Sequence, residues 1–441
     1  MMESMKEKAS PDSIGKSGDI WKALPVAMNI LILLALNIFF FSPLIQLVVR
    51  FVGRSKISRH QYPDLMRYES AIDTTNRIVI FAAIILYIGI ACCAVYRHLN
   101  RRYEPAGSRV LSKDMIRRLL PFFFFVLFAT GILVGTVIRG TNDWDMTGHW
   151  YMHESIFSFI TYPLAYFFCG MLVFSEKARN ILLYLLIGSA LPLHILALVN
   201  EWGTHIVYFE AQGLSTGGVT TVFFNSNHYG YYLVITLLTS ALLFVYEKRK
   251  VLRMVSAISG ITATMVLIIN NTLGAYLAVL FVLILFLIYC MVMDRQNRVN
   301  AVIILAVFLL ITVIMSFRYD TIVSSLLVLS DDIGEIVENP LEADSAGSSR
   351  WRLWKGTVQH LPEHPLLGFG VEGLLSLYQI GTPHNEFLQY AAFFGLPVMV
   401  LYIAACAVVL WRVFRSSKDM SPGTMICFFV SIGYLASSFF G

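Results

Sequence analysis

Four polar residues and one proline, Thr-Pro-His-Asn-Glu at 382–386, stand directly before a long apolar run of this chain. Thr382 is a good N-cap residue and Pro383 a favoured first helical residue, so the stretch predicts the start of a helix. His384 would then lie in the first turn, where unpaired N–H groups attract anions and the helix dipole keeps an imidazole neutral. A neutral histidine beside a bound anion can accept the proton of an incoming hydroxyl. The alternative is an interfacial capping cluster without chemistry.

Two neighbours of His384 could share this chemistry. We expect Asn385 to help hold the substrate in the first helical turn. Glu386 is a predicted substrate contact and also the competing base. It stands two residues after His384 and would point about 200° further around the helix.

A second polar cluster lies on a predicted helix that the serines at 348–349 can cap and that ends before Pro362. Arg350 and Trp354 are one turn apart on this helix, so the guanidinium can lie over the indole ring. A guanidinium fixed in this way suits a bidentate contact with phosphate oxygens. Arg350 could instead neutralise the acidic run at 331–344.

Two nearby patterns have simpler interpretations. The acidic run at 331–344 is predicted to be a solvated loop and not a metal site, because the spacing of a calcium-binding loop is missing. The string Gly-Phe-Gly-Val-Glu-Gly at 368–373 matches a dinucleotide-binding fingerprint in its letters only. No strand precedes it, so we predict a tight turn and no nucleotide.

The elements that must position these residues are membrane helices. Of the 441 residues, 57% are hydrophobic and 14% are charged, whereas a soluble domain has about 25% charged residues. Apolar runs of membrane-spanning length recur along the chain. We therefore predict an all-α integral membrane protein with about eleven transmembrane helices, at 23–49, 78–96, 119–138, 154–175, 180–199, 229–246, 251–269, 273–293, 299–316, 389–411 and 422–440.

The distribution of charge favours a cytoplasmic N-terminus, since the segments that would then face the cytoplasm hold 22 Lys and Arg residues and the outer segments hold 11. The predicted organisation is a cytoplasmic tail (1–22), a membrane bundle (23–316), a large extracytoplasmic loop with the candidate active site (317–388) and C-terminal membrane helices (389–441). The basic outer segment 50–77 contacts either anionic headgroups or an anionic lipid-linked substrate.

The two polar clusters together resemble the signature of the O-antigen ligase and O-antigen polymerase superfamily, which also includes bacterial protein O-oligosaccharyltransferases. An earlier segment, 223–233, resembles the "npN" segment of that family, with Asn225 and Asn227 in place. The positions that match the main signature are Arg350, Trp354, Pro365, Gly368, Gly370, His384, Asn385, Leu388 and Gly395.

This resemblance implies a multi-span glycosyltransferase of the GT-C type in the cytoplasmic (inner) membrane. It would transfer a glycan from a polyprenyl diphosphate carrier to a hydroxyl of a glycan or lipid acceptor, on the outer face, without a metal or other cofactor and without a nucleic-acid partner. His384 would be the base and Arg350 a diphosphate ligand. Substrate contacts would come from Trp354, Asn225, Asn227, Asn385 and Glu386.

The chain departs from the family pattern at two arginines, and Leu273 stands where one of them would be expected. The resemblance therefore requires charge from elsewhere, for which the segment 50–77 is a candidate. The alternative functions are a transporter or flippase of lipid-linked glycans and a non-catalytic binder of them. Flippases bury charged groups inside the membrane, whereas the chemistry of this chain gathers in its large loop, so an enzyme is favoured.

Overall fold

The computed structural model describes ten segments of the chain, and every regular element in them is a helix. This confirms the all-α prediction for that part, whereas eleven spans and the GT-C type stay predictions. The described segments are 43–45, 47–48, 113–140, 176–203, 221–223, 225–319, 321–371, 373–380, 382–415 and 421–439.

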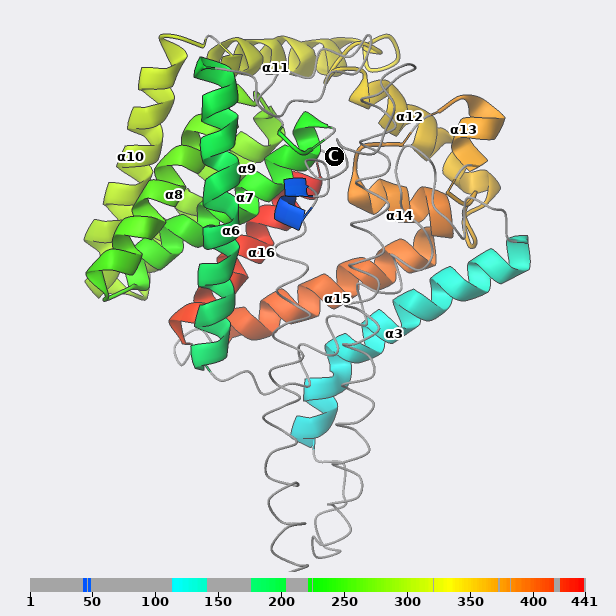
Figure 1. Ribbon diagram of the computed structural model, residues 1–441. Coiled ribbons are helices and arrows are strands. Elements are labelled where there is room, and N and C mark those ends of the chain that lie inside the picture. The colour runs from blue at the N-terminus through cyan, green and yellow to red at the C-terminus, as the bar shows by residue number, and fades with distance from the viewer. Residues whose placement is uncertain are drawn as a thin grey trace, which may run out of the picture.

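The long helices form a bundle with an oblique pair of helices beside it (Figure 1). The bundle consists of α6 (Glu176–Trp202), α7 (Ser226–Tyr246), α8 (Lys250–Ile269), α9 (Leu273–Val292), α10 (Arg298–Ser316) and α16 (Pro422–Ser438). The oblique pair, α3 (Lys113–Arg139) and α15 (Leu396–Arg415), packs side by side. The shorter elements are α11 (Thr321–Glu338), α12 (Arg350–His360), α13 (Gly373–Tyr378), α14 (Glu386–Phe394) and the 3-10 turns η4 (Arg295–Asn297) and η5 (Leu361–Glu363).

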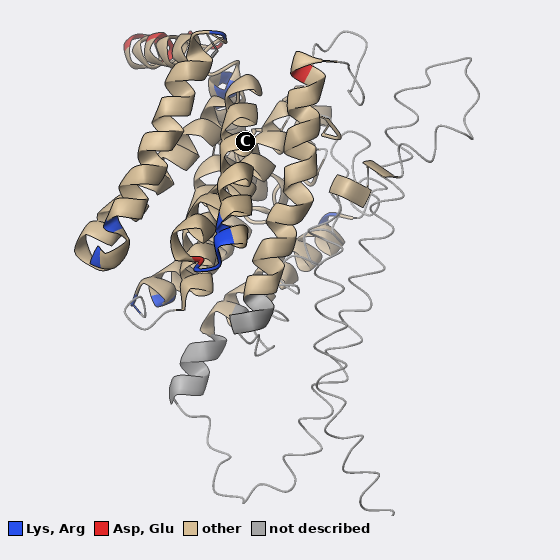
Figure 2. Cartoon of the chain, turned by 60° about the vertical axis from the view of Figure 1, so that its left-hand side comes forward, with Lys and Arg blue, Asp and Glu red and all other residues tan. Residues whose placement is uncertain are grey.

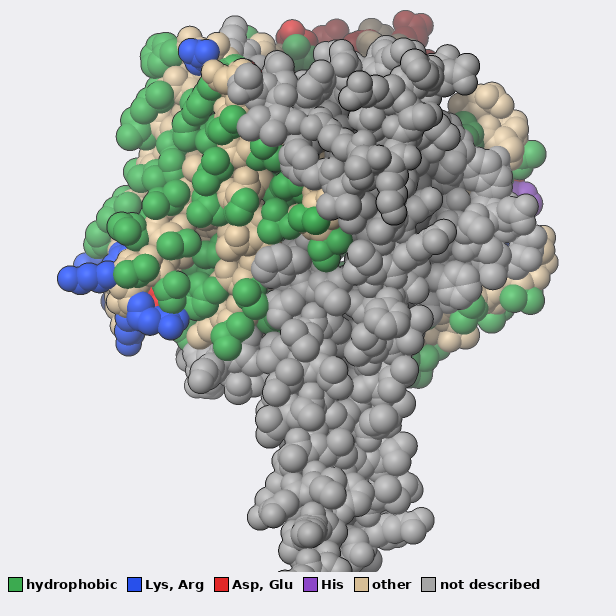
Figure 3. Space-filling view, in the orientation of Figure 1, with side chains coloured by type: hydrophobic (Ala, Val, Ile, Leu, Met, Phe, Trp, Pro, Cys, Tyr) green, Lys and Arg blue, Asp and Glu red, His purple; other side chains and the backbone are tan. Residues whose placement is uncertain are grey.

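The helices agree closely with the apolar runs of the sequence. Six helices of the described residues, α6, α7, α8, α9, α15 and the stretch from η4 through α10, are long and apolar enough to cross a membrane, and α3 and α16 contain shorter apolar helices. Apolar side chains cover the outward face of the bundle (Figure 3), including Val302, Leu310 and Ile314 of α10. Soluble proteins rarely expose such a surface, so these faces fit contact with lipid. Outside the described residues lie almost all of 23–49 and the whole of 78–96 and 154–175.

Helix α7 is the centre of the bundle and packs against α8, α9 and α16. Leu233, Val234 and Leu238 of this helix are fully buried. Gly433 of α16 faces Leu238 so closely that a larger residue would collide with it. Close approach between small and large residues is how helices associate in membranes, and it fixes α16 against α7.

Helix α11 crosses the end of the bundle (Figure 1), and Ser325 donates a hydrogen bond to Asn271 at 3.0 Å. The acidic run at 331–344 is therefore not a loop throughout, because it continues α11 as far as Glu338. The apolar residues among the carboxylates give α11 its helical periodicity, which the charge pattern obscured.

The predicted span 389–411 is not one helix. α14 ends at Phe394, α15 begins at Leu396, and Gly395 between them has φ of 95°. Only glycine adopts this conformation without strain, so the apolar run contains a sharp break that hydropathy alone does not show.

A strap formed by residues 365–370 packs against this break. The backbone N–H of Gly370 donates to the carbonyl of Phe393 at 2.9 Å. Gly368 has φ of 66°, and a Cβ there would lie 2.6 Å from the carbonyl carbon of Phe393. The turn of the strap lies at 365–367, just before the stretch 368–373 where a tight turn was predicted, and α13 begins at Gly373. The glycines at 368 and 370 allow the strap to approach α14.

The two ends of the bundle differ in charge (Figure 2). Acidic residues of α11 lie at one end, together with the short helices α12 and α14. At the other end basic residues gather at the turns that begin α8 and α10: Lys248, Arg249, Lys250, Arg295 and Arg298.

Candidate functional site

The polar stretch at 382–386 leads into α14, which begins at Glu386. Asn385 is the N-cap, because its side-chain oxygen accepts a hydrogen bond from the N–H of Leu388 at 3.0 Å. The amide nitrogen of the same side chain donates to the carbonyl of Phe439 at 3.0 Å. Asn385 is thus buried and joins the start of α14 to the end of α16.

The predicted start of this helix at Thr382 and Pro383 is therefore wrong. The second bond of Asn385 fixes the cap three residues later, a tertiary contact that local propensity does not include. His384 precedes the cap with a left-handed backbone, φ 49°, which is uncommon for a residue with a side chain. The imidazole lies just before the helix and not in its first turn.

Trp354 of α12 joins Arg350's helix to the segment that carries His384. Its indole N–H donates to the carbonyl of Pro383 at 2.7 Å, and its ring lies 5.5 Å from that of Phe439. The predicted stacking of Arg350 on Trp354 does not form in the described structure, since the indole faces these two partners. α12, α14 and α16 therefore meet around Trp354.

Arg350 begins α12, as predicted, and its side chain is partly buried. No described residue forms a hydrogen bond or ion pair with the guanidinium, and its Nε is buried without a hydrogen-bond partner. Burial lowers the pKa of Arg350, but an arginine stays charged. A partly buried cation for which the described residues supply no counter-ion is costly, so this position favours an anionic ligand.

Two other cations at this end already have partners. The ammonium of Lys355 contacts Asp344 at 2.7 Å, so Lys355 and not Arg350 pairs with the acidic run. The guanidinium of Arg139 donates to the carbonyls of Leu367 and Phe393 and holds the strap. Arg350 differs from both, because its guanidinium has no hydrogen-bond or ion-pair partner among the described residues.

His384 is partly buried and lies close to Arg350. Burial, then the positive charge of Arg350, and last the interaction with His228, lower the pKa of the imidazole. No described residue forms a hydrogen bond with its ring. His384 is thus a neutral base near the Arg350 guanidinium, for which the described residues supply no partner. The sequence predicted a neutral His384 from the helix dipole, whereas burial is the main cause in the structure.

The carboxylate of Glu386 faces the tyrosines of α14 and α15. It accepts hydrogen bonds from the hydroxyls of Tyr402 at 2.8 Å and Tyr390 at 3.3 Å. Burial raises the pKa of Glu386. These contacts fix α14 against α15, and they give Glu386 a positioning role beside its predicted contact with substrate.

The start of α7 lies at the same end. The side-chain oxygen of Asn225 accepts from the N–H of Asn227 at 2.7 Å and caps the helix. Asn270 donates to the carbonyl of Ser226 at 2.8 Å, which fixes this turn against the start of α9. The contribution of Asn225 and Asn227 to substrate binding stays a prediction, while their structural contribution is a rigid first turn.

Two residues of α7 near the site, His228 and Tyr231, were not predicted from the sequence. His228 is exposed and close enough to His384 for its charge to act on it. Tyr231 is partly buried and lies near Arg350. Their spacing of three residues, which places them on one helix face, was the available signal.

An apolar groove of about 400 Å³ begins beside Trp354 and the start of α14. Phe387 of α14 and Phe439 of α16 form its end near the site, and Phe439 also contacts Trp354. The groove continues among the side chains of Phe281, Leu410, Ile432, Leu435 and Ala436. The site thus adjoins an apolar surface of membrane helices.

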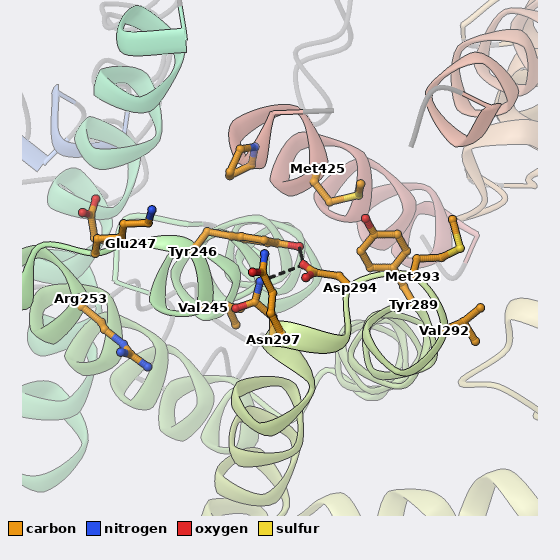
Figure 4. A pocket seen from close by; sticks show the side chains of 13 residues that line it. Val245, Tyr246, Glu247, Arg253, Tyr289, Val292, Met293, Asp294, Asn297 and Met425 are labelled. Carbon is orange, nitrogen blue, oxygen red and sulfur yellow. Dashed lines mark hydrogen bonds between the residues drawn. The ribbon is translucent and has the colours of Figure 1, made fainter. Parts of the chain in front are cut away.

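A larger cavity, of about 1040 Å³, lies at the opposite end of α7 (Figure 4). At its centre Asp294 accepts hydrogen bonds from Tyr246 at 3.0 Å and Asn297 at 2.9 Å. The length of α7 separates this cavity from His228 by roughly 30 Å. Asp294 has these partners, and the guanidinium of Arg253 at this cavity donates to Asn300 at 3.1 Å and lies over the ring of Phe244, although its Nε has no partner among the described residues. We place the candidate site at the other end, where Arg350 and His384 lie close together.

The described residues contain no group of three or more His, Cys, Asp or Glu side chains that could hold a metal ion. The charged groups of the site are Arg350 and the titratable side chains around it.

Residues 258–403 match the family model described as O-antigen ligase. The chain carries an O-antigen ligase domain. The matched range runs from α8 into α15 and includes Arg350, Trp354 and His384, whereas Asn225 precedes it. A comparison with curated proteins and a comparison with solved structures found no match.

The O-antigen ligase match supports membership of the superfamily that the motifs resemble, and in general terms it supports a glycan-transferring function. The residues of the family motif fall into two groups, one that holds helices together and one whose side chains have no hydrogen-bond partner among the described residues. Asn385 and the glycines of the strap hold the helices together. Arg350 and His384 have side chains that lack hydrogen-bond partners among the described residues and lie near each other.

Proposed function

We propose that this protein transfers a glycan from a polyprenyl diphosphate carrier to an acceptor hydroxyl. The observation that carries the proposal is the Arg350 guanidinium, which is partly buried without an anionic partner among the described residues. A diphosphate supplies two groups of oxygens that a guanidinium binds bidentately. The neutral imidazole of His384 lies near that cation, where a proton acceptor is required.

In the proposed step the acceptor oxygen attacks the anomeric carbon of the glycan. The bond between that carbon and the diphosphate oxygen breaks, and its electron pair leaves with the polyprenyl diphosphate. The acceptor proton passes to His384. Arg350 stabilises the negative charge that grows on the leaving oxygen, and the products are a new glycoside and polyprenyl diphosphate.

The apolar groove beside the site supports a lipid-linked donor. Its lining comes from Phe387, Phe439 and side chains of α9, α15 and α16, with almost no polar surface. A polyprenyl chain has no hydrogen-bonding groups, so such a groove suits it. Phe439 contacts Trp354 as well, which puts the groove next to the proposed diphosphate position.

We further propose that the site faces the outside of the cytoplasmic membrane. The basic turns at Lys248–Lys250 and at Arg295 and Arg298 lie at the other end of the bundle (Figure 2). Positively charged short turns favour the cytoplasmic side. The acidic helix α11 and the site would then lie outside.

Labelling of single cysteines tests this orientation. In a variant without native cysteines, Ser345→Cys should react with a membrane-impermeant maleimide on intact cells, since Ser345 is exposed beside α12. Gln296→Cys, also exposed but at the opposite end, should react only after permeabilisation. The reverse pattern would show that the site faces the cytoplasm.

Reconstitution tests the function itself. The purified protein is mixed with a polyprenyl diphosphate-linked oligosaccharide and candidate hydroxyl acceptors, and the products are separated and weighed by mass spectrometry. We expect the acceptor to gain the glycan while polyprenyl diphosphate is released in equal amount. Movement of intact donor across a vesicle membrane would instead identify a transporter, and binding without products a non-catalytic binder.

A further inference from the structure

The start of α7 carries three tyrosines near the site. Two of them, Tyr229 and Tyr232, pack against Phe223, and the third, Tyr231, lies on another side of the helix. Tyr229 is fully buried and stacks on Phe223, with ring centroids 4.7 Å apart. Tyr232 lies 5.3 Å from Phe223 and 6.5 Å from the ring of His194 in α6. Tyr231 is left on the other side of the helix, away from α6.

Helix α16 places Tyr231 beside the site. The ring of Tyr231 lies 6.3 Å from that of Tyr434 in α16. The end of α16 is fixed in turn by Phe439, which accepts a hydrogen bond from Asn385 at 3.0 Å and contacts the ring of Trp354. These contacts form a continuous series from α7 through α16 to α14 and α12, so the position of Tyr231 relative to Arg350 is set by packing.

The hydroxyl of Tyr231 has no hydrogen-bond partner among the described residues, and it is not enclosed as those of Tyr229 and Tyr232 are. Arg350 and Tyr231 interact electrostatically, which requires them to be near each other. A hydroxyl donor and a guanidinium, neither with a hydrogen-bond partner among the described residues, therefore lie within electrostatic reach of each other. Both groups donate hydrogen bonds, and an oxyanion is the ligand that accepts from both.

We propose that Tyr231 is a further substrate-binding residue, whose hydroxyl donates a hydrogen bond to the donor diphosphate held by Arg350. This inference rests on the proposed function for the identity of the anion. Tyr231 would bind a phosphate oxygen that Arg350 leaves unoccupied, and so fix the orientation of the leaving group against His384.

The test measures binding and not turnover. Farnesyl diphosphate and farnesyl monophosphate are titrated into the purified full-length protein in detergent, and dissociation constants are measured by calorimetry. One hydrogen bond to a charged group is worth about ten- to hundredfold in affinity, so Tyr231→Phe should weaken diphosphate binding by this factor. The same variant should lose less affinity for the monophosphate, which has fewer oxygens to share with Arg350.

Tyr232→Phe is the matched control, because it removes the same hydroxyl from the next residue, on the side that faces Phe223 and His194. We expect its affinity for farnesyl diphosphate to equal that of the wild type. Equal affinity of Tyr231→Phe and the wild type would overturn the inference, as would a wild type that does not bind the diphosphate.

The outcomes separate this inference from the proposed function. If Tyr231→Phe weakens diphosphate binding but the wild type transfers no glycan, the diphosphate contact holds and the transferase proposal fails. If the wild type transfers glycan and Tyr231→Phe binds normally, the transferase proposal holds and the contact is wrong.

Discussion

His384→Gln is expected to lower kcat/KM for glycan transfer by about 10²–10⁴-fold, the usual contribution of general-base catalysis. Glutamine keeps a hydrogen-bonding side chain of similar size but cannot accept the acceptor proton. The imidazole lies just before α14, near Arg350, and has no hydrogen-bond partner among the described residues, so no structural contact is lost. Kinetics of the purified variant with the lipid-linked donor measure the effect.

The thermal stability of His384→Gln in detergent serves as the control and should match that of the wild type. The dependence of kcat/KM on pH tests the role of His384 as the base independently. Burial and the nearby positive charge of Arg350 lower the pKa of His384 from its ordinary 6.5, so its basic form persists below that pH. The acid limb of wild-type kcat/KM should accordingly fall below pH 6.5, and a limb well above that value would argue against His384 as the base.

Arg350→Lys is expected to lose about ten- to hundredfold in kcat/KM, which corresponds to roughly 1.5–3 kcal/mol for a hydrogen bond to a charged group. Lysine keeps the positive charge but cannot form the planar bidentate contact. The partly buried guanidinium has no other partner among the described residues, so the loss should appear in catalysis and donor binding rather than in stability.

Arg352→Lys provides the matched comparison, since Arg352 is exposed two residues further along α12. It should retain wild-type kinetics with the same donor and acceptor. Unchanged turnover of Arg350→Lys would reduce Arg350 to a charge-balancing role and remove the main support for a diphosphate site.

Hydropathy located the membrane helices well because each one is a continuous apolar run bounded by polar turns. The predicted spans 229–246 and 273–293 correspond to α7 and α9 within three residues. Hydropathy could not show the break at Gly395, where composition stays apolar on both sides. That break depends on a backbone φ of 95° and on the strap at 365–370, which is distant in sequence.

The candidate site was predictable in its residue types and not in its geometry. Arg350 and His384 were recognised from chemistry and motif, and the structure brings them near each other. The helix start was placed too early because the bond from Asn385 to Phe439 cannot be read from local sequence. Tyr231 was missed because its spacing from His228 is a weak signal in an apolar run, and its relation to Arg350 arises only from the packing of α7 on α16.

We propose that His384 accepts the acceptor proton at the Arg350 site. Two nearby side chains, Glu386 and His228, are the alternative bases. Glu386 is held by the hydroxyls of Tyr390 and Tyr402, which a glutamine can also satisfy. His228 is exposed on α7 and close to His384.

The most direct measurement compares kcat/KM of His384→Gln, Glu386→Gln and His228→Gln with one donor and one acceptor, at matched amounts of folded protein. We predict that His384→Gln alone loses the contribution of a general base, about 10²–10⁴-fold, while the other two stay within about tenfold of the wild type. A nearly wild-type His384→Gln beside an inactive Glu386→Gln or His228→Gln would contradict the account and assign the base to that residue.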